Sequence, residues 1–371
     1  MRRFTYYLFE NFDPDREGDD PGNPRRLLNA SADAPLSRVA DFPPLACPAS
    51  LFREEFGGEG ADRLIAAGAL RETDGVLAYD TPIFLAEDAP VLQGFFTRAA
   101  APLADRLWDI REKLWAAAGE VRTGFAPRRN LYHILCGMIF DGFFFDRLGR
   151  RGAVAVSRPH PTGLDYLSVI YEGCPDLAAF SDRLLCSCNR LTDGETSLES
   201  FGDADGDRFD LYRCFRLREQ GPLPARFREA GALLDRLPRG GERPALLEAA
   251  RSLLRGKGCS KDCLAVLELF GYARDGKICV PAFSREDAPA IEHLAVLVEE
   301  CLYAAVEHTL REAGETLSLT AVRHGVPPLE TANELYHILF GGINEAVVSR
   351  GLAAAPPRKP GEGRYLQCIQ W

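Results

Sequence analysis

No stretch of this 371-residue sequence reaches the roughly 18 consecutive apolar residues that a membrane-spanning helix needs. The first apolar run follows Arg2 and Arg3 and ends at Glu10, which is too short for the core of a secretory signal peptide. The 11 cysteines are odd in number and lack the paired C-x-x-C spacing of zinc sites, which favours free thiols. We therefore expect a cytoplasmic protein with no membrane partner, no metal and no cofactor.

The sequence also lacks an excess of positive charge. Its 44 Lys and Arg residues face 54 Asp and Glu residues, a formal net charge of −10. Such a field repels phosphates, so nucleic acid could be bound only by a locally basic segment. Phosphate-binding loops and the common hydrolase motifs are missing as well, and we assign no catalytic residue.

What the sequence does contain is internal similarity. Residues 131–139 read LYHILCGMI and residues 335–343 read LYHILFGGI, with seven of nine positions identical. Upstream, 84–92 (FLAEDAPVL) and 283–291 (FSREDAPAI) share five of nine. Weaker likenesses join the opening RFTYYLF to RFDLYRCF, which begins at Arg208, and LDYLSVIY to the C-terminal GRYLQCIQW. Because the order is the same in both halves, we interpret the chain as a duplication.

The duplication predicts two α+β repeats that form a pseudo-dimer within one chain. The first repeat covers 1–172 and the second 206–371, and an acidic connector, 173–205, lies between them. The TDGETSLESFGDADGD portion of the connector is polar and contains several glycines, which is typical of a solvated loop.

Each repeat has the same expected order of elements. An opening strand is followed by short helices, a hairpin with Asp-Gly at its tip (Asp74-Gly75 and Asp275-Gly276), a long helix, the LYHIL helix and a closing strand. Asp88 and Asp287 are expected to cap the long helices. Pro102 predicts a kink or break in the first of them.

Short helices leading into such a hairpin resemble a winged-helix domain, over about 43–86 and about 246–284. The resemblance rests on the order of elements. It implies a regulatory, transcription factor-like protein that binds DNA with two pseudo-symmetric halves. The helix before each hairpin would then enter the major groove.

The resemblance makes five basic residues candidates for DNA contact: Arg63, Arg71, Lys257, Lys261 and Arg274. The first copy is otherwise acidic around its helices, and winged helices also serve as protein-interaction modules. A protein–protein scaffold that uses the same repeats is therefore the alternative hypothesis.

A third hypothesis, an enzyme or small-ligand binder, places a pocket between the repeats at Tyr132, His133, Tyr336 and His337. A recurring histidine can shuttle protons or bind a ligand. The alternative, which we favour, is a buried histidine that each copy keeps for packing.

Overall fold

A computed structural model describes residues 1–10, 22–177, 187–202, 209–355 and 365–371. The protein is a mixed α+β structure with several small sheets, as the sequence predicts. Its residues divide into two compact units. Unit 1 contains Met1–Leu103, Phe145–Phe180 and Tyr303–Leu339, and unit 2 contains Ala104–Phe144, Ser181–Leu302 and Phe340–Trp371. Each unit therefore draws on both halves of the sequence.

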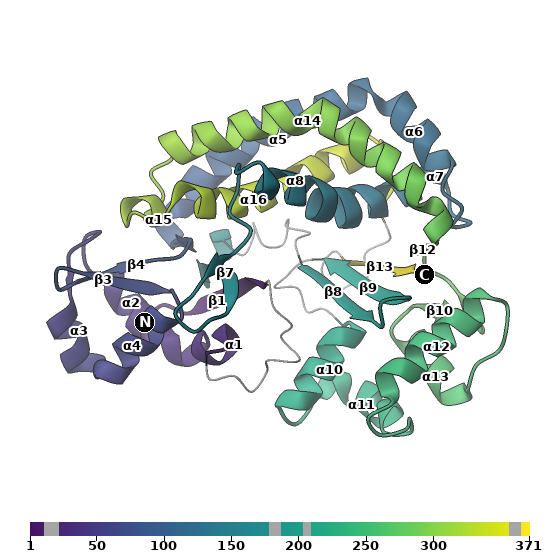
Figure 1. Ribbon diagram of the computed structural model, residues 1–371, viewed down its shortest axis with the longest axis horizontal. Coiled ribbons are helices and arrows are strands. Elements are labelled where there is room, and N and C mark those ends of the chain that lie inside the picture. Colours follow the sequence, from purple (N-terminus) through teal and green to yellow (C-terminus); the bar gives the residue numbers. More distant parts are fainter. Residues whose placement is uncertain (11–21, 178–186, 203–208, 356–364) are drawn as a thin grey trace. The chain divides into compact units, whose positions relative to one another are not determined.

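Unit 1 contains two sheets and short helices. Its elements are β1 (Phe4–Glu10), α1 (Pro24–Leu27), η1 (Ala30–Ala32), α2 (Asp33–Val39), β2 (Cys47–Pro48), α3 (Ala49–Phe56), α4 (Gly58–Ala66), β3 (Leu70–Thr73), β4 (Val76–Tyr79), β5 (Ile83–Phe84), η2 (Ala86–Asp88), α8 (Phe145–Arg150), β6 (Arg158–Pro159), β7 (Asp165–Glu172) and α15 (Thr320–Arg323). Figure 1 shows α3 and α4 beside the hairpin of β3 and β4.

Unit 2 has the same mixture of elements. They are α6 (Arg111–Gly119), α7 (Pro127–His133), the π-helical η3 (Ile134–Phe144), β8 (Ser187–Thr192), β9 (Ser197–Gly202), α10 (Leu211–Gln220), η4 (Ala225–Phe227), α11 (Arg228–Leu234), α12 (Glu242–Leu254), α13 (Lys261–Leu269), β10 (Ala273–Arg274), β11 (Lys277–Ile278), β12 (Ala282–Phe283), η5 (Arg285–Asp287) and β13 (Tyr365–Gln370). Three long helices, α5 (Ala89–Asp109), α14 (Ala288–Thr316) and α16 (Pro328–Ser349), contribute residues to both units.

The main sheets of the two units share a strand pattern. In unit 1, β7 pairs antiparallel with β1 and parallel with β5. In unit 2, β13 pairs antiparallel with β9 and parallel with β12. Residues 166–171 of β7 are all buried, as expected for a strand with neighbours on both edges and cover on both faces.

The two hairpins form where the sequence places them. Asp74 and Gly75 have φ angles of 53° and 74°, and Asp275 and Gly276 have φ angles of 51° and 72°. Two successive positive φ values define the tight turn that Asp-Gly favours between antiparallel strands. The prediction of a hairpin in each half is confirmed.

The long helices begin at the predicted carboxylates. Asp88 accepts a hydrogen bond from the Leu85 amide at 2.8 Å, and Asp287 accepts one from the Ser284 amide at 2.8 Å. Pro102, in contrast, does not end its helix, since α5 continues to Asp109. The proline is exposed, so water can reach the carbonyl group that loses its amide partner.

Two expectations about the middle of the chain are wrong. Residues 192–202 of the expected solvated loop belong instead to the antiparallel pair β8–β9, which turns at 193–196, and the remaining residues 203–207 lie outside the described part of the chain. Leu191, Leu198 and Phe201 are buried. The segment that begins with RFDLYRCF is not a counterpart of the opening strand, because it forms α10 behind the N-cap Asp210. The strand that pairs with β13 as β1 pairs with β7 is β9.

Candidate functional sites

The recurring Tyr-His pairs lie inside the two units. Tyr132 and His133 are in α7 of unit 2, and Tyr336 and His337 are in α16 of unit 1, all at 4% exposure or less. Burial lowers the pKa of His133 well below its usual value, so its imidazole is neutral. His337 shares a 2.8 Å hydrogen bond between Nδ1 and the Asn333 carbonyl oxygen, and its ring packs on Phe9 and Phe145. These contacts fit the packing interpretation, and a ligand pocket at the four residues stays a prediction.

Glu334 lies one helical turn before His337 on α16 and is also buried. The Tyr171 hydroxyl donates a hydrogen bond to its carboxyl group. Burial raises the pKa of Glu334, while His337 and Tyr171 act in the opposite direction. Catalytic sites often contain a buried carboxylic acid with a shifted pKa, as at Glu334, but structural hydrogen-bond networks contain such groups as well.

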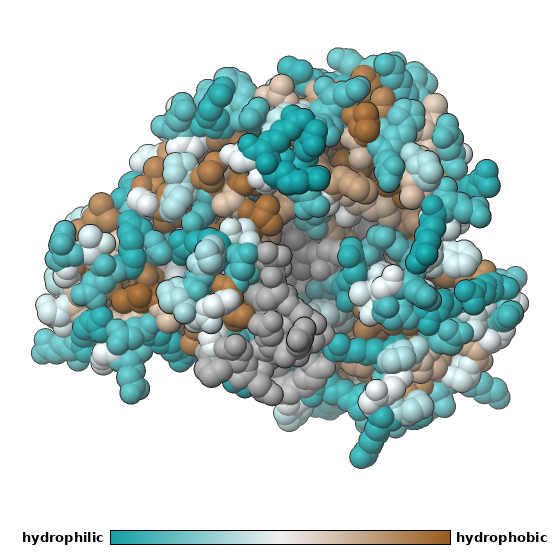
Figure 2. Space-filling model, in the orientation of Figure 1, coloured by the Kyte–Doolittle hydropathy of each residue, from teal (hydrophilic) through white to brown (hydrophobic). Residues whose placement is uncertain are grey.

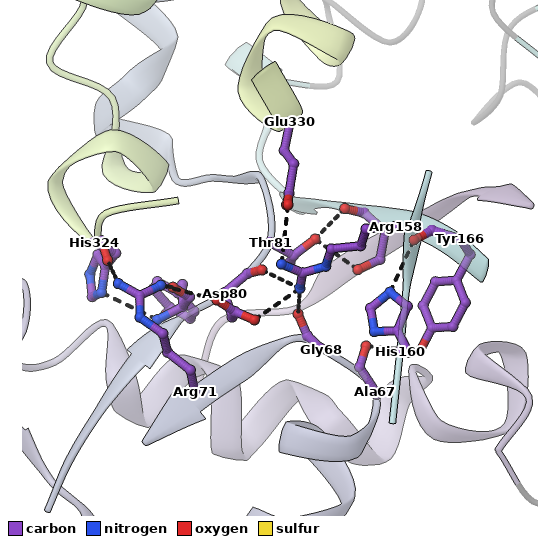
Figure 3. Close-up of polar contacts among 12 residues, drawn as sticks. Ala67, Gly68, Arg71, Asp80, Thr81, Arg158, His160, Tyr166, His324 and Glu330 are labelled. Atoms are coloured by element: carbon purple, nitrogen blue, oxygen red, sulfur yellow. Dashed lines mark hydrogen bonds and ion pairs between the residues drawn. The ribbon is translucent and has the colours of Figure 1, made fainter. Parts of the chain in front are cut away.

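The most connected polar cluster of unit 1 centres on Arg158 (Figure 3). Its Nη1 lies 3.2 Å from the Glu330 carboxylate, and its Nη2 lies 3.0 Å from the Asp80 carboxylate. Nη2 also donates to the backbone carbonyls of Gly68 and Asp80, at 2.9 and 2.5 Å. Burial raises the pKa of Glu330, and Arg158 opposes that shift. One guanidinium thus holds β6, the end of β4 and the start of α16 together.

Arg71 extends this cluster toward α15. Its Nη1 donates to the Asp80 carboxylate at 3.1 Å and to the Tyr79 carbonyl at 2.9 Å, and its Nη2 donates to the His324 carbonyl. His324 Nδ1 accepts from the Tyr79 amide at 3.3 Å, which requires an unprotonated nitrogen. Burial, with Arg323 and Arg71 nearby, lowers the pKa of His324 to about 4. The positive charges of the cluster are therefore directed at protein atoms rather than at solvent.

The elements α3, α4, β3 and β4 (Ala49–Tyr79), here the first hairpin module, use their arginines internally. Arg63 donates to the carbonyls of Arg26 and Leu27, each at 2.9 Å. Arg53 forms ion pairs with Asp62 and Glu72, each at 2.8 Å. Two of the five candidate DNA contacts, Arg63 and Arg71, are thus bound to oxygens of their own chain.

The elements α12, α13, β10 and β11 (Glu242–Ile278), here the second hairpin module, leave their basic residues at the surface. Lys257, Lys261 and Arg274 are exposed, and so is Lys277, which the sequence reasoning missed. Figure 2 shows hydrophilic residues over much of the face of α12 and α13 in that view. Of the five candidate DNA contacts, the three in the second hairpin module are therefore exposed to solvent, and the two in the first are bound to oxygens of their own chain.

Sequence reasoning also missed Asp80, Arg158, His324 and Glu330. One signal was available for Glu330, because PLETANELYHIL places Glu330, Thr331, Asn333 and Glu334 within an otherwise apolar helix. All four are buried. No comparable signal marks Arg158, whose partners lie 78 to 172 residues away in the chain.

Within the described ranges, no group of three or more His, Cys, Asp and Glu side chains is placed to hold a metal ion. None of the helices in that part of the chain is long and apolar enough to cross a bilayer. Comparison of the chain with protein-family models, with curated proteins and with solved structures found no match.

Proposed function

We propose that this chain is a regulatory, transcription factor-like protein that binds double-stranded DNA through the second hairpin module. The module presents a helix, α13, directly before a hairpin whose turn has Asp275 and Gly276 at positive φ. This order of elements is the one on which the winged-helix resemblance rests. The helix would lie against the major groove, and the hairpin would contact the neighbouring backbone.

The exposed charge of this module is the observation that carries the proposal. Between Arg255 and Lys277 there are five basic residues and three acidic residues. Two of the acids are engaged within the protein: Asp262 lies 3.9 Å from Arg236, and Glu268 accepts a hydrogen bond from the Gly276 amide at 3.1 Å. The module is thus locally positive on a chain whose overall charge is negative.

Three of the five lysines in the whole chain, at 257, 261 and 277, fall in this short segment. An exposed ammonium group on a flexible stem binds phosphate as a point charge, without a fixed partner geometry. Such contacts fix a protein on DNA without reading its sequence. The proposal therefore predicts affinity that depends strongly on salt.

The test is fluorescence anisotropy with a labelled random-sequence duplex of about 25 base pairs, titrated at several salt concentrations. If Lys257, Lys261, Arg274 and Lys277 each neutralise one phosphate, log K should fall against log salt with a slope of about −3.6. Changing any one of them to glutamine should reduce the slope by about 0.9 and weaken binding about eightfold at 0.1 M salt.

Lys113→Gln is the matched control, because Lys113 is an exposed lysine on α6, outside the module. Its affinity and slope should equal those of the wild type. DNA affinity that does not depend on salt would contradict the proposal. An equal loss of affinity in Lys113→Gln would also contradict it.

A further inference from the structure

His133, on α7 of unit 2, is a buried histidine whose ring nitrogens have no hydrogen-bond partner. The residue is 1% exposed, and neither Nδ1 nor Nε2 bonds to any atom in the described part of the chain. A buried polar atom without a partner costs the fold free energy, so such atoms are rare unless a water or a ligand serves them. His337, which aligns with His133 in the LYHIL segments, does share a hydrogen bond through Nδ1. Packing therefore does not explain the unserved nitrogens of His133.

Arg129 lies one helical turn before His133 on the same face of α7 and also lacks a partner. It is partly buried, its Nε is buried without a hydrogen bond, and no carboxylate of the described residues forms an ion pair with its guanidinium. Burial lowers the pKa of Arg129, and burial together with the nearby charge of Arg129 lowers the pKa of His133. Because helical side chains lean toward the N-terminus, the imidazole leans toward the turn that carries Arg129. A buried cation normally has an anionic partner, and here that partner is missing.

The helix changes form directly after His133. The next residues form η3 (Ile134–Phe144), which is π-helical, and π-helical turns are rare and occur frequently at functional sites. The second LYHIL segment differs on both counts, since α16 is α-helical from Pro328 to Ser349. Its residue at the position of Arg129 is Asn333, whose Nδ2 donates to the Ala155 carbonyl at 2.7 Å. The unpaired cation and the π-helix therefore occur together in the first segment only.

We infer that Arg129 and His133 form a binding site for a phosphate group, either free phosphate or the phosphate of a small molecule. The planar fork of Arg129 holds two oxygens of an oxyanion, and the N–H of the neutral imidazole donates to a third. A carboxylate has only two oxygens and cannot serve both side chains in this way. Arg129 is partly exposed and gives access from solvent, whereas His133 is buried too deeply for the backbone of a DNA duplex. The site is therefore independent of the proposed DNA contacts.

The test is isothermal titration calorimetry of the full chain with inorganic phosphate at constant ionic strength. The wild type should show saturable binding, and Arg129→Gln and His133→Phe should each weaken it about tenfold, the effect of one lost hydrogen bond to a charged group. Without phosphate, both variants should unfold thermally at the wild-type temperature or above it, because each removes unpaired buried polar atoms. Unchanged phosphate affinity with a lower unfolding temperature would show a purely structural role and overturn the proposal. If His133→Phe does not fold, Arg129→Gln decides alone, since its side chain is partly exposed.

Arg128→Gln is the matched control, because it removes the same charge from the neighbouring residue of α7. Arg128 is exposed, and its Cζ lies 4.3 Å from the ring centre of Trp115. This variant should bind phosphate within about twofold of the wild type, since an exposed charge contributes little. An equal loss in Arg128→Gln, or no saturable binding in the wild type, would overturn the proposal.

Two further ligands identify the chemistry of the anion. Acetate should bind about tenfold more weakly than phosphate, because it offers no third oxygen to His133. Acetate affinity equal to that of phosphate would overturn the assignment. Glycerol phosphate distinguishes the two sources of the phosphate group: tighter binding than that of inorganic phosphate indicates a small-molecule ester, and weaker binding indicates free phosphate.

Discussion

Replacing Arg158 with methionine removes the side chain that joins β6, the end of β4 and the start of α16 in unit 1. Methionine keeps an unbranched apolar stem but has no hydrogen-bond donors, so the Glu330 and Asp80 carboxylates and the Gly68 and Asp80 carbonyls lose their partner. The side chains of Glu330 and Arg158 are 7% and 20% exposed, so rehydration can only partly replace the lost bonds. We expect the free energy of unfolding to fall by about 3 kcal/mol.

Arg158 and Glu330 should be energetically coupled, so that the effects of substituting them are not additive. Burial already raises the pKa of Glu330, and removal of Arg158 should raise it further. Glu330→Gln should therefore cost about 1–2 kcal/mol in the wild type, where it breaks the ion pair, but little in Arg158→Met. Arg158→Lys keeps the charge but loses the fork geometry, so its unfolding free energy should lie between those of the wild type and Arg158→Met.

The assay is urea denaturation followed by far-ultraviolet circular dichroism and by tryptophan emission. All three tryptophans, at 108, 115 and 371, belong to unit 2, so their emission reports on that unit. Amide hydrogen exchange in Leu70–Tyr79 and in the first turn of α16 reports directly on unit 1. A loss below about 0.5 kcal/mol in Arg158→Met, or full additivity with Glu330→Gln, would refute the reasoning.

Three further predictions concern single groups. The pKa of His324 is lowered from 6.5 to about 4, so the folded protein loses stability as the pH falls from 6.5 toward 4. Over that range the free energy of unfolding measured by urea denaturation should fall by about 2–3 kcal/mol. The fall should be smaller in His324→Gln. Asp88→Ala leaves the buried amides of Thr320 and Leu85 without an acceptor and should cost about 2 kcal/mol in urea denaturation. Asp287→Ala does the same to the partly buried amides of Arg122 and Ser284 and should cost about 1 kcal/mol, and the asparagine variants should cost less. Gly276→Ala, at a φ of 72°, should lower the unfolding free energy by about 1 kcal/mol and weaken DNA binding if the hairpin contacts the duplex.

The sequence predicts the local elements of this fold well where short-range chemistry decides them. Asp-Gly between strand-like runs gives a hairpin in both halves. Asp88 and Asp287 immediately precede the long helices, and each accepts a hydrogen bond from the amide three residues earlier rather than from an amide of the long helix. These outcomes depend on neighbours within a few residues, and tertiary contacts do not overrule them. The α+β class follows from the same local signals.

Local sequence patterns do not predict the structure in the middle of the chain. Polar composition favours a loop over 192–207, yet residues 198–201 are all buried, and β9 pairs with β13, which lies far away in the sequence. Asp210 followed by apolar residues is a helix start, but the likeness of the next residues to the opening strand obscured it. For β9 the decisive contacts are long-range, and for α10 the local signal is the capping residue Asp210.

The polar cluster of unit 1 could not be predicted, because its members are far apart in the chain. Arg158 bonds to Glu330 across 172 residues, and Arg71 bonds to the His324 carbonyl across 253. Only tertiary structure brings such groups together. Arg63, which the sequence marks as a candidate DNA contact, is likewise bound to two backbone carbonyls that no spacing rule identifies.

Differences in charged-residue content and in how the cations are bound give the two hairpin modules different electrostatics. The chain has 39 arginines and five lysines. In the first hairpin module Arg53, Arg63 and Arg71 bind carboxylates or carbonyls of their own chain, so the exposed charge that remains is negative. Planar guanidinium groups suit such fixed acceptors, while ammonium groups remain hydrated. The lysines of the second module keep their charge at the surface. The sign of each module follows from its sequence, since Ala49–Tyr79 has three basic and six acidic residues and Glu242–Ile278 has seven basic and five acidic residues. The structure adds which of these charges face solvent and which are bound within the protein.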